Sequence, residues 1–267
     1  MLEHKVIYNS IDIARDYGSR DYIEAPELAL LKEVEGSLAG ARMLDMGVGG
    51  GRTTKYFGPR AGQYIGADYA PNMVEICRAK YPQYDFYECD VRDMKIFADG
   101  SFDFVLFSYN GLDSFSHSDR MVALEEINRV LSKTGRFAFS SHNLYWRRLT
   151  DLFRLKIRDM DGQTTMGGRM VHYSRQIYKN LRLSYLNRSL IMESFIRQLR
   201  QNERGSLYDN SLNGRASVYY VGRDEQIRQL KAAGFSGIDT FARSGSCTSS
   251  PQELNRGAWI YYLCRKS

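Results

Sequence analysis

Short hydrophobic runs alternate with amphipathic stretches along the first half of the chain. Each run has the length of a buried β-strand, and the runs lie just before Asp45 and at 63–68, 84–88, 102–107 and 136–141. The stretch 118–131 carries hydrophobic residues at helical spacing, namely Met121, Leu124, Ile127 and Leu131. This alternation predicts an α/β fold with a doubly wound parallel sheet covered by helices on both faces.

The same pattern returns near the end of the chain. Residues 223–233 are expected to form a helix that stops at Gly234, because glycine commonly ends helices. Hydrophobic runs at 235–242 and 258–264 then supply two further strands. We therefore expect seven strands in one sheet.

A glycine-rich turn follows the first strand. Gly47, Gly49 and Gly51 come directly after Asp45, and glycines there leave the backbone amides open to a ligand. Their spacing is one residue shorter than the G-x-G-x-x-G of dinucleotide-binding folds, which argues against a nicotinamide cofactor. Asp68 ends the second strand, where an acidic side chain can bind both hydroxyls of a ribose. A plain turn and a helix cap are the alternatives for these two features.

Five segments in this order resemble the class I S-adenosylmethionine-dependent methyltransferases. They are 44–52, 66–73, 89–91, 101–105 and 130–136. The resemblance covers about 10–142 and resumes from about 218, so it implies a Rossmann-like methyltransferase core of 1–142 and 218–267. It also implies a mostly parallel seven-stranded sheet whose last strand is antiparallel.

The resemblance assigns S-adenosylmethionine as the cofactor and gives roles to individual residues. The implied positions are Asp45, Gly47, Gly49 and Gly51 for its amino-acid part, Asp68 for its ribose, Tyr69, Met73, Asp90 and Val91 for its adenine, Ser108 and Asn110 for its methionine end, and Tyr17 and Tyr22 for closure over it. Asp90 could instead close an Asx-turn, and the two N-terminal tyrosines could simply pack against the core.

Residues 143–217 interrupt the family pattern and are too long for a simple connection. Within 144–206 there are 13 lysines and arginines against 5 aspartates and glutamates, a balance of +8 in a chain of net charge +6. The rest of the chain therefore sums to −2. We expect one or two helices after Leu181, a turn or loop at 161–169, and a basic lid that shapes the acceptor pocket.

The charge of this insertion has three interpretations. Arginines such as Arg197 and Arg200 could clamp an anionic small substrate, for instance a phosphorylated, carboxylated or nucleotide-linked sugar metabolite. The surface could instead face RNA or DNA, or it could be a solvated helix face. Because no recognisable nucleic-acid module accompanies the charge, a small-molecule acceptor is favoured. An RNA-directed methyltransferase and a non-catalytic S-adenosylmethionine-binding protein remain the alternatives.

Candidate catalytic residues lie where the fourth and fifth strands end. If the acceptor is a hydroxyl, a base must take its proton, and Asp113, His117 and His142 are the candidates. An amine acceptor needs alignment more than a base. No paired carboxylates have a clear metal-ligand spacing, so no metal is expected.

The composition and the N-terminal residues predict the cellular compartment of the protein. A chain of 267 residues can bury one large α/β core, and its four cysteines lie far apart in the sequence, as suits a reducing compartment. The charged N-terminus lacks a signal-like apolar stretch, and no segment approaches membrane-spanning length. We expect a cytoplasmic protein without a membrane partner, and the oligomeric state stays open.

Overall fold

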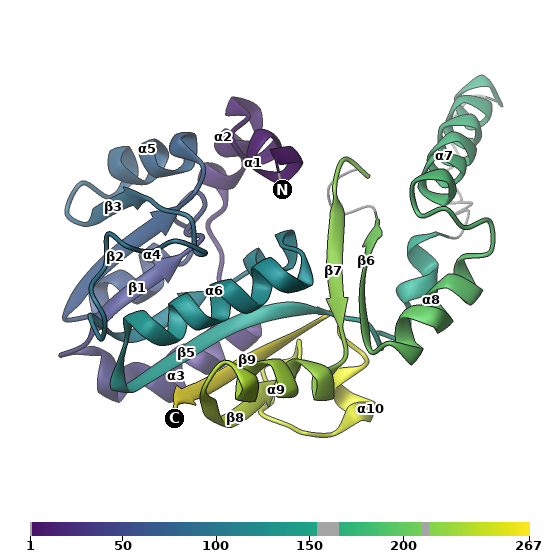
Figure 1. Ribbon diagram of the computed structural model, residues 1–267. Helices are drawn as coiled ribbons and strands as arrows, with labels where there is room; N and C mark the ends of the chain where they lie inside the picture. The colour runs from purple at the N-terminus through teal and green to yellow at the C-terminus, as the bar shows by residue number, and fades with distance from the viewer. Residues whose placement is uncertain (1, 154–165, 210–213) are drawn as a thin grey trace.

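A mixed nine-stranded sheet organises the molecule (Figure 1). The computed structural model describes residues 2–153, 166–209 and 214–267. The strands are β1 Arg42–Met46, β2 Gln63–Asp68, β3 Asp85–Glu88, β4 Phe102–Phe107, β5 Leu131–Asn143, β6 Arg204–Tyr208, β7 Ser217–Val221, β8 Phe235–Phe241 and β9 Trp259–Lys266. Their order is β3-β2-β1-β4-β5-β7-β6, and β9 pairs with both β5 and β8. The doubly wound α/β fold expected from the sequence is confirmed.

Helices connect the strands and cover both sheet faces. In chain order they are α1 Leu2–Tyr8, α2 Ile11–Ser19, α3 Ala25–Leu38, α4 Thr54–Phe57, α5 Pro71–Lys80, α6 His117–Val130, α7 Met166–Leu186, α8 Met192–Gln201, α9 Arg223–Ala232 and α10 Pro251–Leu254. Short 3-10 turns occupy Gly58–Arg60, Gly111–Ser114 and Leu149–Leu152. Helix α6 begins at a serine cap, because the Ser116 side chain accepts a hydrogen bond from the Asp119 amide.

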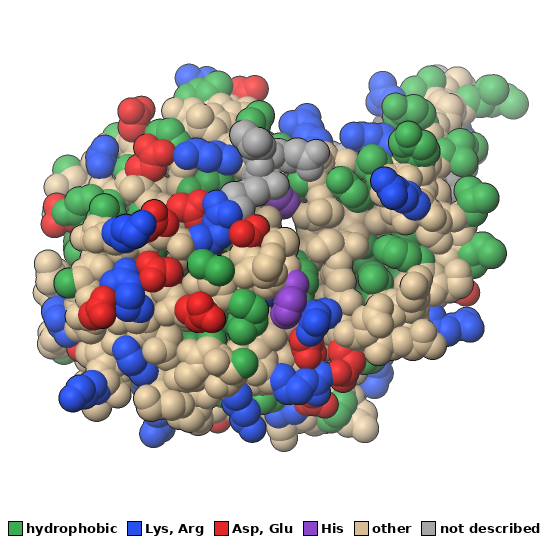
Figure 2. Space-filling model, viewed as in Figure 1, with side chains coloured by type: hydrophobic (Ala, Val, Ile, Leu, Met, Phe, Trp, Pro, Cys, Tyr) green, Lys and Arg blue, Asp and Glu red, His purple; other side chains and the backbone are tan. Residues whose placement is uncertain are grey.

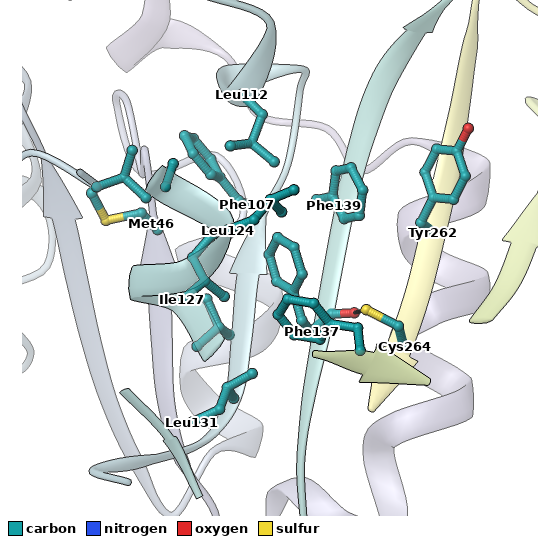
Figure 3. Close-up of a cluster of buried hydrophobic side chains, with 14 of the residues drawn as sticks. Met46, Phe107, Leu112, Leu124, Ile127, Leu131, Phe137, Phe139, Tyr262 and Cys264 are labelled. Atoms are coloured by element: carbon teal, nitrogen blue, oxygen red, sulfur yellow. Dashed lines mark hydrogen bonds between the residues drawn. The ribbon is translucent and has the colours of Figure 1, made fainter. Parts of the chain in front are cut away.

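Successive side chains of the central strands point to opposite faces of the sheet and pack into two separate hydrophobic cores. On β4, Val105 joins the core under α6 and α9, whereas Leu106 joins the core under α3, α4 and α5. In the first core Leu124 and Ile127 of α6 meet Phe137 and Phe139 of β5 (Figure 3). The two cores hold the carboxyl ends of β1, β2 and β4 at one edge of the sheet, where polar side chains collect.

Two strands were not among the seven expected, namely β6 inside the insertion and β7 at its end, where the core resumes. Strand β5 pairs with β9 in antiparallel fashion over Arg136–His142 and with β7 in parallel fashion only at His142 and Asn143. Strands β6 and β7 form an antiparallel hairpin at this end of β5. The seven expected strands are thus all present, and β6 and β7 bring the total to nine.

The helices expected in the insertion are α7 and α8. The turn or loop expected at 161–169 lies partly outside the described residues, and its second part is wrong, because 166–169 form the first turn of α7. Two adjacent glycines suggested a break there. Met166 and Met170 nevertheless keep helical spacing, and a side chain at Gly167 would meet open space.

Candidate functional site

The turn after β1 has a backbone that only glycine adopts easily. Gly47, Gly49 and Gly51 have φ angles of 64°, 55° and 78°, in the left-handed region that disfavours side chains. A Cβ on Gly47 would lie 2.3 Å from the Phe107 ring at the end of β4. The turn therefore sits directly against the neighbouring strand end.

Two buried carboxylates stand at the strand ends beside this turn. Asp68 accepts hydrogen bonds from the backbone amides of Gly49 (3.0 Å) and Ala70 (2.9 Å). Asp45 accepts hydrogen bonds from the hydroxyls of Thr53 (2.6 Å) and Tyr64 (2.7 Å). Burial raises the pKa of each carboxyl to about 6, because a low-dielectric surrounding disfavours the charged form.

A cavity opens over the turn, and we call it the glycine-turn cavity. Of the predicted cofactor residues, Tyr17, Gly47, Gly49, Asp68, Tyr69, Met73 and Ser108 line it, and Asp45 lines its continuation toward Arg52. The hydroxyl of Tyr69 is buried without a hydrogen-bond partner among the described residues. Such a group normally has a partner, so this wall of the cavity suits a polar ligand.

Other predicted cofactor residues do not line the glycine-turn cavity. Asp90 is engaged by Arg92 (2.6 Å), and although burial opposes ionisation, this guanidinium holds the pKa of the carboxyl below its usual value. Val91 is part of the hydrophobic core, and Gly51 packs beside the ring of Tyr81. The hydroxyl of Tyr22 hydrogen bonds to that of Tyr109 (3.0 Å). Roles for these positions toward a cofactor stay predictions.

The N-terminal helices cover the glycine-turn cavity. A Cβ placed on Gly50 would lie 2.4 Å from the backbone of both Tyr17 and Gly18, so the end of α2 rests directly on the turn. Tyr8 of α1 meets Tyr17 edge-on at 5.9 Å between ring centroids and Tyr69 at 6.3 Å. Helix α1 also reaches the β6–β7 hairpin, since His4 Nε2 lies 2.9 Å from the Ser217 carbonyl oxygen.

A buried ion pair behind the turn was not expected from the sequence. Arg52 binds Glu27 of α3 through two hydrogen bonds, one of them 2.6 Å from Nη1 to Oε2. Ser108 donates a hydrogen bond to the same carboxylate, and the Glu27 side chain is fully buried. The pair ties the turn to α3 and to the end of β4. A single Glu in the first turn of a helix gives no sequence signal of this role.

A second cavity of about 250 Å³ lies beside the first, and we call it the His142 cavity. Its walls include Asn110, Asp113, His142 and Trp259, together with Arg20 of the chain just after α2. It shares Tyr8, Tyr17, Tyr109 and Ser114 with the glycine-turn cavity. A group held in one cavity therefore lies next to a group held in the other.

Asp113 and His142 form a hydrogen-bonded pair in the wall of the His142 cavity. Asp113 Oδ2 lies 2.6 Å from His142 Nδ1, and the His142 amide donates to the same oxygen at 2.6 Å. Asp113 Oδ1 accepts hydrogen bonds from Arg120 and Ser141, both at 2.7 Å. A carboxylate accepting from Nδ1–H leaves His142 Nε2 as the basic nitrogen. Sequence reasoning identified both members of the pair but missed Arg120.

The loop after β4 is held in an unusual backbone conformation. Tyr109 and Asn110 have positive φ angles of 57° and 63°, and Asn110 receives support from Ser140, whose hydroxyl accepts its amide hydrogen bond at 2.8 Å. Consecutive non-glycine residues in the left-handed region are costly and cluster at functional sites. Asn110, expected at the methionine end of the cofactor, lines the His142 cavity and not the glycine-turn cavity.

His117 is separated from this pair. Its Nδ1 lies 3.1 Å from the hydroxyl of Tyr219, and it lines neither of the two cavities. Burial lowers its pKa, and the nearby positive charge of Arg204 lowers it further. The three predicted catalytic residues are therefore divided, with only Asp113 and His142 brought together.

No described residue of the insertion, 143–217, lines either cavity, whereas Val218 of β7, directly after it, lines the His142 cavity. Arg200 donates hydrogen bonds to the carbonyl oxygens of Leu144 (3.2 Å) and Trp146 (3.4 Å), so it braces the insertion on the end of β5. Arg200 therefore has a structural role here, and a clamp of Arg197 and Arg200 on a substrate stays a prediction. The described residues also contain no cluster of three or more metal-ligating side chains.

Comparisons with known proteins agree with this architecture. Residues 44–139 match a family model described as a methyltransferase domain. An uncharacterized methyltransferase, YcgJ of Bacillus subtilis (strain 168), is 30% identical over 125 residues, which is 45% of this chain and 48% of the relative. The chain thus spans about half the length of this curated relative.

Solved methyltransferases share the fold across most of the chain. An S-adenosylmethionine-dependent methyltransferase from Clostridium acetobutylicum superimposes with a TM-score of 0.61 at 12% identity, covering 91% of each chain. The 1,6-didemethyltoxoflavin-N1-methyltransferase of Burkholderia thailandensis has a TM-score of 0.55 at 16% identity and covers 91% of this chain and 78% of its own.

Proposed function

We propose that the chain carries a class I S-adenosylmethionine-dependent methyltransferase domain and that it methylates a small molecule bound in the His142 cavity. The observation that carries the proposal is the Asp113–His142 pair, 2.6 Å apart, in a cavity that shares a wall with the glycine turn. This arrangement supplies a proton acceptor beside a cofactor site.

The residues of the glycine-turn cavity fit S-adenosylmethionine. The turn offers backbone amides in a cradle that side chains would fill, and the buried Tyr69 hydroxyl lacks a partner among the described residues. Asp68 would hold the ribose hydroxyls, Tyr69 and Met73 would contact the adenine, and Asp45 with the turn would hold the amino-acid part. When bound, S-adenosylmethionine supplies a methyl group activated by its sulfonium charge.

The chain's own residues then have three tasks. The two cavities must align the acceptor atom with the methyl group. The tyrosines of α1 and α2 form part of the cavity walls and exclude water from the reacting atoms. His142 Nε2 accepts the proton of an acceptor hydroxyl. Asp113 keeps the proton of the neutral ring on Nδ1 and stabilises the imidazolium that forms, as an orienting carboxylate does in other acid–base pairs.

Two observations support a small acceptor over a nucleic acid. The His142 cavity is a compact hollow of about 250 Å³ walled by aromatic side chains, which suits a single ring system. Among solved relatives with this fold, one is named for 1,6-didemethyltoxoflavin and another, from Thermotoga maritima, as a possible histamine N-methyltransferase. The wall contains the cation Arg20, but Asp16 pairs with it at 2.8 Å. An anionic substrate is therefore not needed to balance the charge of the cavity.

Cofactor binding is the first test. Calorimetry with S-adenosylhomocysteine should give micromolar binding, and Asp68→Ala should weaken it by about 1–3 kcal/mol, the scale of lost hydrogen bonds to a carboxylate. NAD should not bind. Binding of NAD more tightly than S-adenosylhomocysteine would refute the cofactor assignment.

The proton-transfer step is the second test, with a panel of phenols, catechols and heteroaromatic amines followed by mass spectrometry. For a hydroxyl acceptor, His142→Gln should lower kcat by about 10²–10⁴-fold while S-adenosylhomocysteine affinity stays the same. His117→Gln is the matched control and should keep full activity. A small effect of His142→Gln on an active acceptor would indicate an amine, and methylation of RNA but of none of the panel would overturn the small-molecule proposal.

A further inference from the structure

The outer face of α7 is hydrophobic and uncovered. The exposed fractions of Met166, Met170, Leu181 and Tyr185 are 82%, 67%, 62% and 82%. The helix extends away from the sheet at one end of the molecule, and the space-filling view shows hydrophobic side chains gathered over it (Figures 1 and 2). Ten of the chain's exposed large hydrophobic residues fall within 166–191, namely Met166, Met170, Val171, Tyr173, Ile177, Tyr178, Leu181, Tyr185, Leu190 and Ile191.

These side chains share one side of the helix. At 3.6 residues per turn, those between Met166 and Tyr185 cover an arc of about 160°. The opposite side makes the contact with the body of the protein, because Leu183 is buried and Asn187, just after α7, hydrogen bonds to the Tyr208 carbonyl oxygen at 2.9 Å. The exposed arc is therefore not the packing face of α7, and no contact with another described residue explains why it is hydrophobic.

Charge on α7 is of one sign. The helix carries Arg169, Arg175, Lys179 and Arg182 and no aspartate or glutamate. On the helical wheel Arg169 and Arg175 flank the hydrophobic arc on its two edges, and both are exposed. A hydrophobic face bordered by cations is typical of helices that lie in the interface of an anionic membrane.

We propose that the outer face of α7 binds an anionic lipid surface. The hydrophobic arc would enter the boundary between headgroups and acyl chains, and its three tyrosines suit that boundary because their rings are apolar with a polar tip. The flanking arginines would meet acidic headgroups. No described helix is long and apolar enough to cross a bilayer, and a helix lying in the interface needs no such span. The expectation of no membrane partner rested on the lack of a membrane-spanning segment, and it therefore does not apply to a helix that lies in the interface.

A second copy of the chain fits this face less well. Two α7 helices packed through their hydrophobic arcs would bring arginines against arginines with no acidic residue on either helix to pair with them. The helix also stands out as a ridge, and a ridge enters a deformable lipid surface without needing a matching groove.

Vesicle co-sedimentation tests the proposal on the whole protein. We expect binding to vesicles of phosphatidylcholine with phosphatidylserine, little binding to phosphatidylcholine alone, and weaker binding as salt rises. Ile177→Ser combined with Leu181→Ser should lower the affinity by about tenfold or more, since two exposed hydrophobic side chains are lost from the contact. Arg169→Gln with Arg175→Gln should weaken it by about tenfold and reduce its salt dependence.

Matched controls are available away from α7. Val122→Ser removes a hydrophobic residue of α6 that is 43% exposed, and Lys133→Gln removes an exposed cation of β5. Both should bind vesicles as the wild type does, and all variants should keep S-adenosylhomocysteine affinity. Equal binding to neutral and anionic vesicles, or none to either, would overturn the proposal. So would a dimer that becomes a monomer in the Ile177→Ser, Leu181→Ser variant without any vesicle binding, because the face would then join two copies.

Discussion

Replacing Gly50 with alanine is expected to push α2 away from the glycine turn. The added methyl would lie 2.4 Å from the Gly18 nitrogen and from the Tyr17 carbonyl carbon. That is about 1 Å short of the 3.5 Å at which such atoms rest comfortably. The obstructing atoms belong to backbone, so no side-chain rotation relieves the contact. Gly50 does not have a positive φ, and the effect of alanine is therefore a contact effect alone.

The size of the effect follows from what holds α2 in place. Inserting a methyl into a packed contact costs about 1–3 kcal/mol. Helix α2 is anchored through a small cluster in which Ala14 meets Ala70 and Met73, so it can move aside while the sheet remains intact. We expect the melting temperature to change little and the cofactor to lose its cover. A loss of about 1–3 kcal/mol corresponds to a Kd for S-adenosylhomocysteine raised about 5- to 150-fold.

Calorimetry and thermal denaturation measure the two quantities. Gly36→Ala is the matched control, because a Cβ there meets nothing within 4 Å and the residue lies exposed in α3. It should stabilise the protein by up to about 1 kcal/mol through helix propensity and leave the Kd unchanged. Wild-type affinity in Gly50→Ala would refute the reasoning, since it would mean that α2 does not close over the cofactor.

Two further predictions concern the buried charges around the turn. Glu27→Ala leaves the Arg52 guanidinium buried and unpaired, so it should destabilise the protein by about 3–5 kcal/mol, measured by urea denaturation, and an unchanged midpoint would contradict the ion-pair role. Burial raises the pKa of Asp45 from 3.8 to about 6, so folding favours its protonated form and this contribution is present below about pH 4 and lost by about pH 6. Relative to Asp45→Asn, the wild type should lose up to about 3 kcal/mol of unfolding free energy across that window, and a parallel pH dependence of the two proteins would argue against it.

The parts that the sequence predicted well are those specified by neighbouring residues. Hydrophobic runs of strand length and the glycine spacing after Asp45 are local signals, and the strands and the turn lie where those signals indicate. Asp113 and His142 were also identified, because the ends of parallel strands meet at one edge of a sheet.

Most of the missed features depend on contacts between distant segments. Strand β7 is a local signal that sequence reasoning missed, because Ser217–Val221 consists of valines and tyrosines after its first residue. Strand β6, Arg204–Tyr208, has no such composition and is defined by its pairing with β7. The partner of Arg52 lies 25 residues earlier in a helix. Arg120 is held beside Asp113 by contacts with Ser141 and Gln226, which lie 21 and 106 residues away in the sequence. Charge counting likewise located the positive insertion without revealing that Arg200 turns toward backbone carbonyls.

Tyr8 and Tyr17 belong to the walls of both cavities, and this has a thermodynamic consequence. A ligand that fixes these side chains in one cavity lowers the conformational cost of binding in the other. By linkage, whatever factor the first ligand adds to the affinity of the second, the second adds to that of the first. A substitution at Tyr17 thus changes two dissociation constants together, and neither site can be tuned through that side chain alone.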